Sequence, residues 1–170
     1  MSIFLKQYYG NSRMTAKQIM TDWKLFLAFG FGSGLSKYMP GTMGTLAAIP
    51  LYLLMTQINI WLYSILTVAA VFGGIGICRY AAEKLDVHDF GGIVWDEVVG
   101  LLITFWFVPF SWHALIGGFV LFRIFDIIKP WPIKWIDRKV GGGLGIMLDD
   151  VLAGLFAGLI LIILIMYLPY

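Results

Sequence analysis

The sequence is short of cysteine, histidine and charged residues, and each shortage excludes a kind of protein. A single cysteine, Cys78, excludes an internal disulfide and a metal cluster held by cysteines. With only two histidines as well, a metal site in this chain has to be built from oxygen ligands. Charged residues make up 13% of the chain, the net charge is +2, and no basic patch with interleaved aromatic residues is evident from the sequence alone, so we expect no nucleic-acid partner.

Apolar residues are abundant instead. They make up 60% of the 170 residues and the mean hydropathy is +0.86, which indicates a polytopic membrane protein rather than a soluble domain. The length corresponds to one domain. We expect residues 1–20 to form a peripheral polar leader and residues 21–170 to form a single membrane-embedded domain.

The apolar segments predict an all-α bundle with about five membrane segments, some of them short or broken. They lie at about 42–56, 60–78, 95–108, 112–128 and 149–168. The third and fourth share the uncharged run 98–122, which Pro109 interrupts, so we interpret them as a hairpin of two short helices rather than one span. Residues 14–31 mix charged and apolar side chains and are typical of an interfacial amphipathic helix.

This topology places every lysine, arginine, aspartate and glutamate on one side of the membrane. The excess of lysine and arginine assigns that side to the cytoplasm. Nine of the twenty-two charged residues fall within 123–150, between two apolar segments. We therefore predict that one membrane face carries a polar site, to which several distant parts of the chain contribute.

The glycine-rich stretch 30–45 contains five glycines, several hydroxyl groups and one lysine, and it precedes a helix. Such a loop can cradle an anion with its backbone N–H groups, which makes Lys37, Thr42 and Thr45 candidate phosphate contacts. It is not a nucleotide-binding P-loop, because the required Gly-Lys-Ser/Thr order is missing. A flexible loop where the chain enters the membrane is an equally good interpretation.

Acidic residues near a bilayer are costly, so they are usually functional or paired. The candidates are Asp89, Asp96, Glu97, Asp126, Asp149 and Asp150. Their hard oxygens favour Mg²⁺ or Ca²⁺ over zinc. Neighbouring residues on a helix project about 100° apart, so Asp96 and Glu97 cannot aim at one point unless a helix begins there. We expect Asp96 and Asp150 to point into the site, with Glu97 and Asp149 behind them or as further ligands. Capping and ion pairing alone remain an alternative, and Asp149 can cap its helix.

Two cations complete the pattern. Arg123 offers phosphate a bidentate donor, and Asp126, one turn later, either ligates a metal or neutralises this arginine. Lys129 precedes Pro130, where the helix must end, so its ammonium can reach outward to a phosphate. Asp89 and the preceding histidine lie in a loop and could transfer a proton.

Several of these motifs closely resemble the phosphatidylglycerophosphatase A family, a family of bacterial inner-membrane lipid phosphatases. They are residues 93–100 with Trp95-Asp96-Glu97, residues 122–132 with Arg123, Asp126 and Lys129, residues 142–154 with Asp149-Asp150, and the earlier stretches 34–36 and 40–45. The resemblance implies Mg²⁺-dependent hydrolysis of phosphatidylglycerophosphate to phosphatidylglycerol and inorganic phosphate at the cytoplasmic face. It implies an acidic set of Asp96, Glu97, Asp126, Asp149 and Asp150, with Arg123 and Lys129 as basic positions.

A small membrane cation carrier that uses its clustered acids as an ion path is the alternative from another class. It predicts acids on both sides of the membrane or at its middle, whereas the predicted topology gathers them at one face. We expect a phospholipid substrate and membrane lipids as partners, and the sequence does not determine an oligomeric state.

Overall fold

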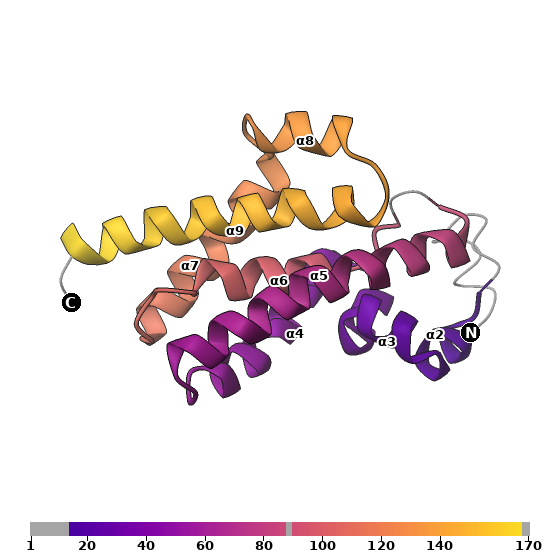
Figure 1. Ribbon diagram of the computed structural model, residues 1–170, viewed down its shortest axis with the longest axis horizontal. Coiled ribbons are helices and arrows are strands. Elements are labelled where there is room, and N and C mark those ends of the chain that lie inside the picture. Colours follow the sequence, from indigo (N-terminus) through magenta and orange to yellow (C-terminus); the bar gives the residue numbers. More distant parts are fainter. Residues whose placement is uncertain (1–13, 88–89, 168–170) are drawn as a thin grey trace.

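The computed structural model describes residues 14–87 and 90–167, and regular structure in these ranges is entirely helical (Figure 1). The predicted all-α class is therefore confirmed. The elements are α2 Ala16–Thr21, α3 Trp23–Ala28, the 3₁₀ helix η1 Gly30–Leu35, α4 Pro40–Met55, α5 Ile60–Leu85, α6 Trp95–Thr104, α7 Trp112–Ile128, α8 Ile133–Lys139 and α9 Gly142–Tyr167.

Two of these helices, α5 and α9, are long and apolar enough to cross a membrane. Each has 26 residues, which corresponds to roughly 39 Å at the helical rise. The helices α4 and α7 have 16 and 17 residues, and α6 has only 10, or roughly 15 Å, about half of a hydrocarbon core. The count of about five membrane segments stays a prediction, with α6 too short to cross by itself.

The hairpin predicted around Pro109 is present. The helix α6 ends at Thr104 and α7 begins at Trp112, where the Ser111 hydroxyl accepts a hydrogen bond from the Ala114 N–H and caps the new helix. The beginning of α6 and the end of α7 therefore lie at the same end of the bundle.

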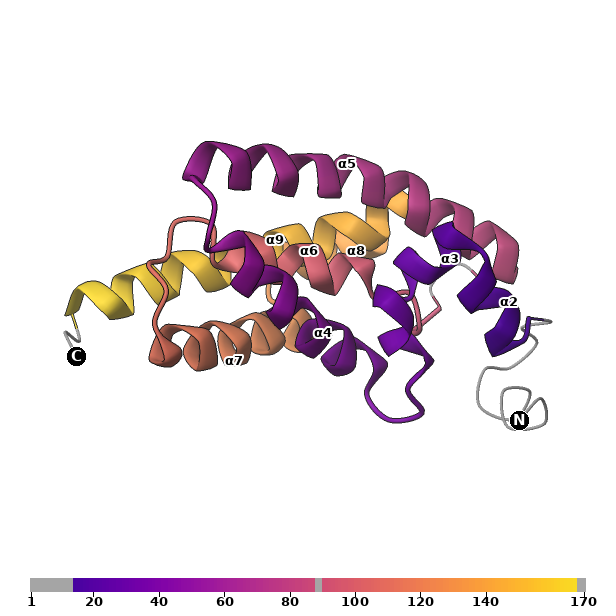
Figure 2. The same cartoon turned by 90° about the horizontal axis from the view of Figure 1, so that it is seen from below.

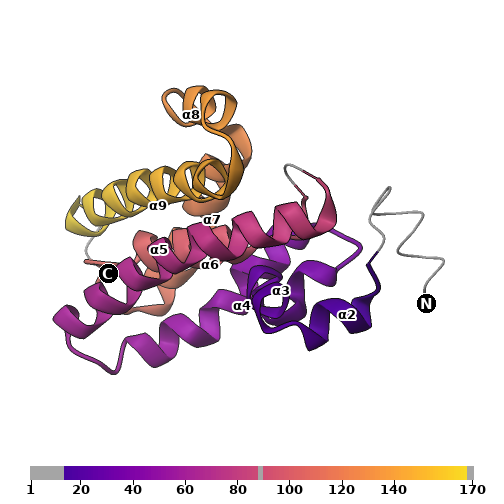
Figure 3. The ribbon, with the colours of Figure 1, turned by 45° about the vertical axis from the view of Figure 1, so that its right-hand side comes forward.

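At the centre of the bundle lies α6, which contacts α4, α5, α7 and α9 (Figures 2 and 3). Its residues 98–105 are all buried. Gly100 and Gly154 let α6 and α9 cross at close range. A Cβ atom added at Gly154 would overlap the Gly100 carbonyl oxygen, and one added at Gly100 would lie 2.9 Å from the Asp150 carbonyl oxygen. This crossing brings the start of α6 next to the acidic part of α9.

The predicted interfacial helix 14–31 is wrong as a single element, because the chain breaks at Asp22. Asp22 has an extended backbone, and its carboxylate accepts hydrogen bonds from the N–H groups of Lys24 and Leu25 at the start of α3. The Tyr80 hydroxyl donates to the same carboxylate at 2.8 Å and attaches α3 to α5. Partial burial acts to raise the pKa of Asp22, but these hydrogen bonds outweigh it and lower the pKa below its ordinary value.

The last helix also begins earlier than predicted, at Gly142 instead of about 149. Its glycine-rich start resembles a loop in sequence but packs closely in the structure. A Cβ atom at Gly143 would overlap the Ile75 carbonyl oxygen of α5, and one at Gly145 would overlap the Val140 carbonyl oxygen. This packing outweighs the poor helix propensity of glycine. As a result Asp149 lies in the third turn of α9 and cannot cap the helix.

Candidate metal and phosphate site

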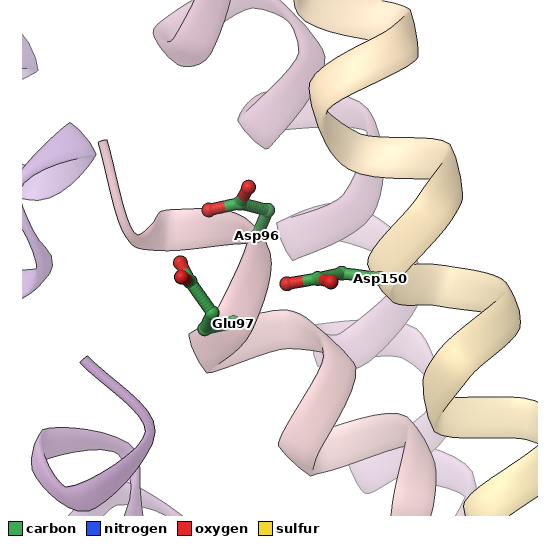
Figure 4. Close-up of side chains that lie close together, drawn as sticks. All are labelled: Asp96, Glu97 and Asp150. Atoms are coloured by element: carbon green, nitrogen blue, oxygen red, sulfur yellow. The ribbon is translucent and has the colours of Figure 1, made fainter. Parts of the chain in front are cut away.

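Three carboxylates from two helices meet at the crossing of α6 and α9 (Figure 4). Asp96, Glu97 and Asp150 each offer one oxygen, and these oxygens all lie within 4.8 Å of one another. The helix α6 begins at Trp95, so Asp96 and Glu97 stand in its first turn. A helix start is the exception that lets neighbouring acids aim at one place. The structure thus brings Glu97 into the same cluster as Asp96 and Asp150, whereas Asp149 lies outside it.

Each of the three carboxylates has one buried oxygen that lacks a hydrogen-bond partner within residues 14–87 and 90–167. Within the part of the chain that the structure describes, Asp96 Oδ1, Glu97 Oε2 and Asp150 Oδ2 are buried and have no hydrogen-bond partner. A buried unpaired oxygen costs roughly 1–3 kcal/mol, and three clustered negative charges also repel one another. A hard divalent cation among these oxygens would relieve both costs, so the residues fit a Mg²⁺- or Ca²⁺-type site.

Arg123 of α7 lies beside this cluster. Its Nη1 atom is 2.6 Å from Asp126 Oδ2, 3.3 Å from the Thr45 hydroxyl and 4.0 Å from Glu97 Oε1. Asp126 therefore neutralises this arginine, which was one of its two expected roles. Arg123 Nε is buried and, among the described residues, has no hydrogen-bond acceptor. The arginine can thus still donate to an anion placed against the cluster.

The glycine-rich stretch reaches the site through the first turns of α4. Thr45 is fully buried, and its hydroxyl donates to the Gly41 carbonyl oxygen at 2.9 Å while it accepts from Arg123. A Cβ atom at Gly41 would overlap Glu97 Oε1, so a side chain at this position would require Glu97 or α4 to shift. Lys37 is exposed and Thr42 is half-buried. Neither residue lines the cavity that opens between α6, α7, α8 and α9.

A cavity of about 190 Å³ opens between α6, α7, α8 and α9, with room for several water molecules. Its charged lining residues are Asp96, Glu97, Asp126, Lys129, Asp137, Asp149 and Asp150. Six carboxylates and one ammonium thus surround a small polar space. This composition suits a phosphate that is bound together with a metal ion.

The sequence suggested that Lys129 reaches outward, but the structure holds it inside this cavity. Its ammonium donates to Asp137 Oδ1 at 2.6 Å and to Asp149 Oδ2. Burial alone would lower the pKa of Lys129, but the two hydrogen bonds outweigh it and raise the pKa above that of an ordinary lysine. The lysine therefore remains protonated across the physiological pH range.

Asp137 is the site residue that the sequence did not reveal. It stands in the run Asp137-Arg138-Lys139, which resembles a solvated surface segment. A usable signal was present, because Asp137 is the only acid in a short basic helix and therefore differs from its neighbours. The predicted site residue Asp89, and the histidine before it, lie outside the described residues.

Comparisons with known proteins identify a family and several relatives of this chain. Residues 26–165 match the family model described as phosphatidylglycerophosphatase A. Phosphatidylglycerophosphatase A of Escherichia coli (strain K12) is 49% identical over 145 residues, which cover 85% of this chain and 84% of the relative. The protein of the same name from Haemophilus influenzae is 44% identical over 133 residues, covering 77% of this chain and 82% of the relative.

A third relative carries a different name. A protein of Bacteroides thetaiotaomicron, provisionally named phosphatidylinositol-3-phosphatase, is 39% identical over 145 residues, covering 78% of this chain and 87% of the relative. No solved structure matches the chain. The family match spans most of the sequence, including all the elements that build the acidic cluster. The chain therefore belongs to the phosphatidylglycerophosphatase A family.

Proposed function

We propose that this protein hydrolyses the terminal phosphate monoester of phosphatidylglycerophosphate and releases phosphatidylglycerol and inorganic phosphate. The names of two relatives support this substrate, since both are phosphatidylglycerophosphatases. The observation that carries the proposal is the buried cluster of Asp96, Glu97 and Asp150, with unpaired oxygens and two cations beside it. The cation-carrier alternative gains nothing from the relatives, because all three are named as phosphatases.

In this proposal Asp96, Glu97 and Asp150 would hold Mg²⁺, which would supply positive charge for the phosphoryl oxygens and activate a water. Arg123 donates to the substrate phosphate through its buried, unpaired Nε atom and neutralises charge that develops in the transition state. The fixed geometry of its guanidinium comes from Asp126 and Thr45.

Lys129, which lines the cavity, binds a second phosphate oxygen. Its half-buried side chain is already held by Asp149 and Asp137, so little conformational entropy is lost when the substrate binds. A carboxylate outside the metal-binding set, either Asp126 or Asp149, accepts the proton of the attacking water. Lys37 and Thr42 have no assigned role in this scheme, because neither lines the cavity.

The position of the site relative to the membrane is part of the same proposal. The charged ends of α6, α7 and α9, with the start of α4 beside them, face the cytoplasm at the bacterial inner membrane, and about five segments enter the bilayer. The acyl chains of the substrate stay in lipid while its head group enters the cavity. This division explains why a phosphate-binding site is built between apolar helices. The common feature of the relatives' named substrates is a phosphate monoester on a lipid head group.

The test measures phosphate release from purified protein with phosphatidylglycerophosphate in mixed micelles, with Mg²⁺ or with a chelator. We expect turnover only with the metal and a loss of about 100-fold or more in kcat for Asp150→Asn. Asp86→Asn is the matched control, because Asp86 is exposed and lies away from the cavity. Phosphatidylinositol 3-phosphate as a second substrate tests head-group selectivity. Metal-independent turnover, or an Asp150→Asn variant that is folded and fully active, would remove the proposed site.

A further inference from the structure

The short helix α8, which lies against α9, has two faces of different chemistry. Its inner face carries the fully buried Ile133, the half-buried Ile136 and Val140, and Asp137, which is bonded to Lys129. At 100° per residue these four positions span an arc of roughly 100°. The inner face therefore holds the helix in place and holds its only acid against the site.

The outer face of α8 is basic and aromatic. Lys134, Trp135, Arg138 and Lys139 are all exposed and occupy the remaining arc, and Trp131 in the preceding turn is 82% exposed. None of the three cations forms an ion pair with another residue of the described ranges. Three positive charges and two indole rings thus project from the bundle without a protein partner there.

The helix stands out from the bundle on the side of α9 opposite α5, next to the N-terminal half of α9 (Figures 1 and 3). That half carries Asp149 and Asp150, and the apolar remainder is long enough to enter a membrane. Exposed tryptophans next to lysines and arginines are typical of the membrane–water interface. Each lysine or arginine near an anionic leaflet strengthens binding by about fivefold, so three of them favour anionic over neutral lipid strongly.

We propose that the outer face of α8, with Trp131, docks on an anionic lipid surface, and that the Asp137–Lys129 ion pair couples this docking to the catalytic site. Lys129 joins three elements, because it ends α7 and bonds to Asp137 of α8 and Asp149 of α9. A docked α8 fixes one of the two acceptors that position its ammonium. The docking itself is independent of the proposed phosphatase activity, whereas the coupling to turnover rests on it.

The docking is tested by amide hydrogen exchange of the full chain in nanodiscs of phosphatidylcholine, with or without phosphatidylserine. Phosphatidylserine is anionic but carries no phosphate monoester, so it cannot act as substrate. We expect exchange in residues 133–139 to slow by about tenfold when phosphatidylserine is present. The triple variant Lys134→Gln, Arg138→Gln, Lys139→Gln should lose this slowing.

A matched control removes the same charge from other exposed positions, with Lys17→Gln, Arg79→Gln and Lys84→Gln, and should keep the slowing. Equal exchange of α8 in both lipids, or equal loss in both triple variants, would overturn the docking. Protection by soluble polyglutamate as strong as that by phosphatidylserine would also overturn it, in favour of an acidic protein partner.

The coupling is tested by phosphate release in the same nanodiscs. We expect phosphatidylserine to stimulate the wild type severalfold and to leave the outer-face triple variant unstimulated. Asp137→Asn should keep the lipid-dependent protection of α8 but lose the stimulation. Stimulation that persists in Asp137→Asn would overturn the coupling. A wild type that is inactive under all conditions but still protected at α8 would refute the phosphatase proposal and the coupling, and leave the docking intact.

Discussion

Replacement of Gly41 by alanine tests how closely α4 is fitted to the acidic cluster. The added Cβ atom would overlap Glu97 Oε1 and stand 3.2 and 3.3 Å from the two terminal nitrogens of Arg123. Ordinary van der Waals contact is restored only if Glu97 or the start of α4 moves by roughly 1 Å. A displacement of that size in a catalytic group can cost about 100-fold in rate, or about 2.7 kcal/mol of transition-state stabilisation.

The assay is phosphate release from phosphatidylglycerophosphate with Mg²⁺, together with thermal unfolding of the same preparation. Gly73→Ala is the matched control, because Gly73 lies in α5 and an added Cβ atom there meets nothing within 4 Å. We expect Gly41→Ala to lose about 100-fold in kcat with a Tm within a few degrees of wild type, and Gly73→Ala to lose nothing.

Shortening Glu97 tests whether its contact with the added methyl group causes the loss of activity. In the double variant Gly41→Ala, Glu97→Asp the shorter acid leaves room for the new methyl group, so the two effects should be clearly less than additive. A folded Gly41→Ala enzyme with wild-type kcat would refute the close approach of α4 to the site. Full additivity would show that the loss has a cause other than contact with Glu97.

Three further outcomes are expected. Asp149→Asn should reduce kcat by roughly 10-fold and Asp150→Asn by roughly 100-fold or more, because Asp149 lies outside the metal cluster and is bonded to Lys129. Equal losses of kcat in the phosphate assay would contradict this difference. Thr45→Val should lower kcat about tenfold, since it removes the hydroxyl that accepts from Arg123, and Thr45→Ser should restore it. Asp22→Ala should cost about 1 kcal/mol of stability through loss of the α3 cap, measured by thermal unfolding. Because the folded-state pKa of Asp22 is lowered, its charge stabilises the fold above the ordinary carboxyl pKa and that contribution disappears as the pH falls through the lowered value, so the wild type and Asp22→Ala should converge in acid.

Features that depend on short stretches of chain were predictable. Pro109 and the polar residues after it indicate a turn, and the α6–α7 hairpin follows from them. The gathering of the charged residues at one end of the bundle is a prediction from the apolar segments that separate them. That Asp96, Glu97 and Asp150 are acidic site residues was a prediction from their position and their hard oxygens, and the structure shows them close together.

Which acids join the cluster and which pair with a lysine was not predictable, because it depends on contacts between helices far apart in sequence. The 3.6-residue period fixes which side chains share a face of one helix, but not which face meets which neighbour. The crossing at Gly100 and Gly154 turns Asp150 toward Asp96 and leaves Asp149 to Lys129. Local propensity also misplaced the start of α9, because packing of Gly143 against α5 decides it.

By itself, then, the sequence determined an all-helical apolar chain, its membership in a lipid phosphatase family and the chemistry available at one end of it. Composition and short motifs suffice for these properties, since each depends on residues that are neighbours in the chain. Only the tertiary structure decided that Asp137 joins the site, that Lys129 is held inside it and that a side chain at position 41 would overlap Glu97. Those contacts join α4, α6, α7, α8 and α9, and their distances are set by how the helices pack.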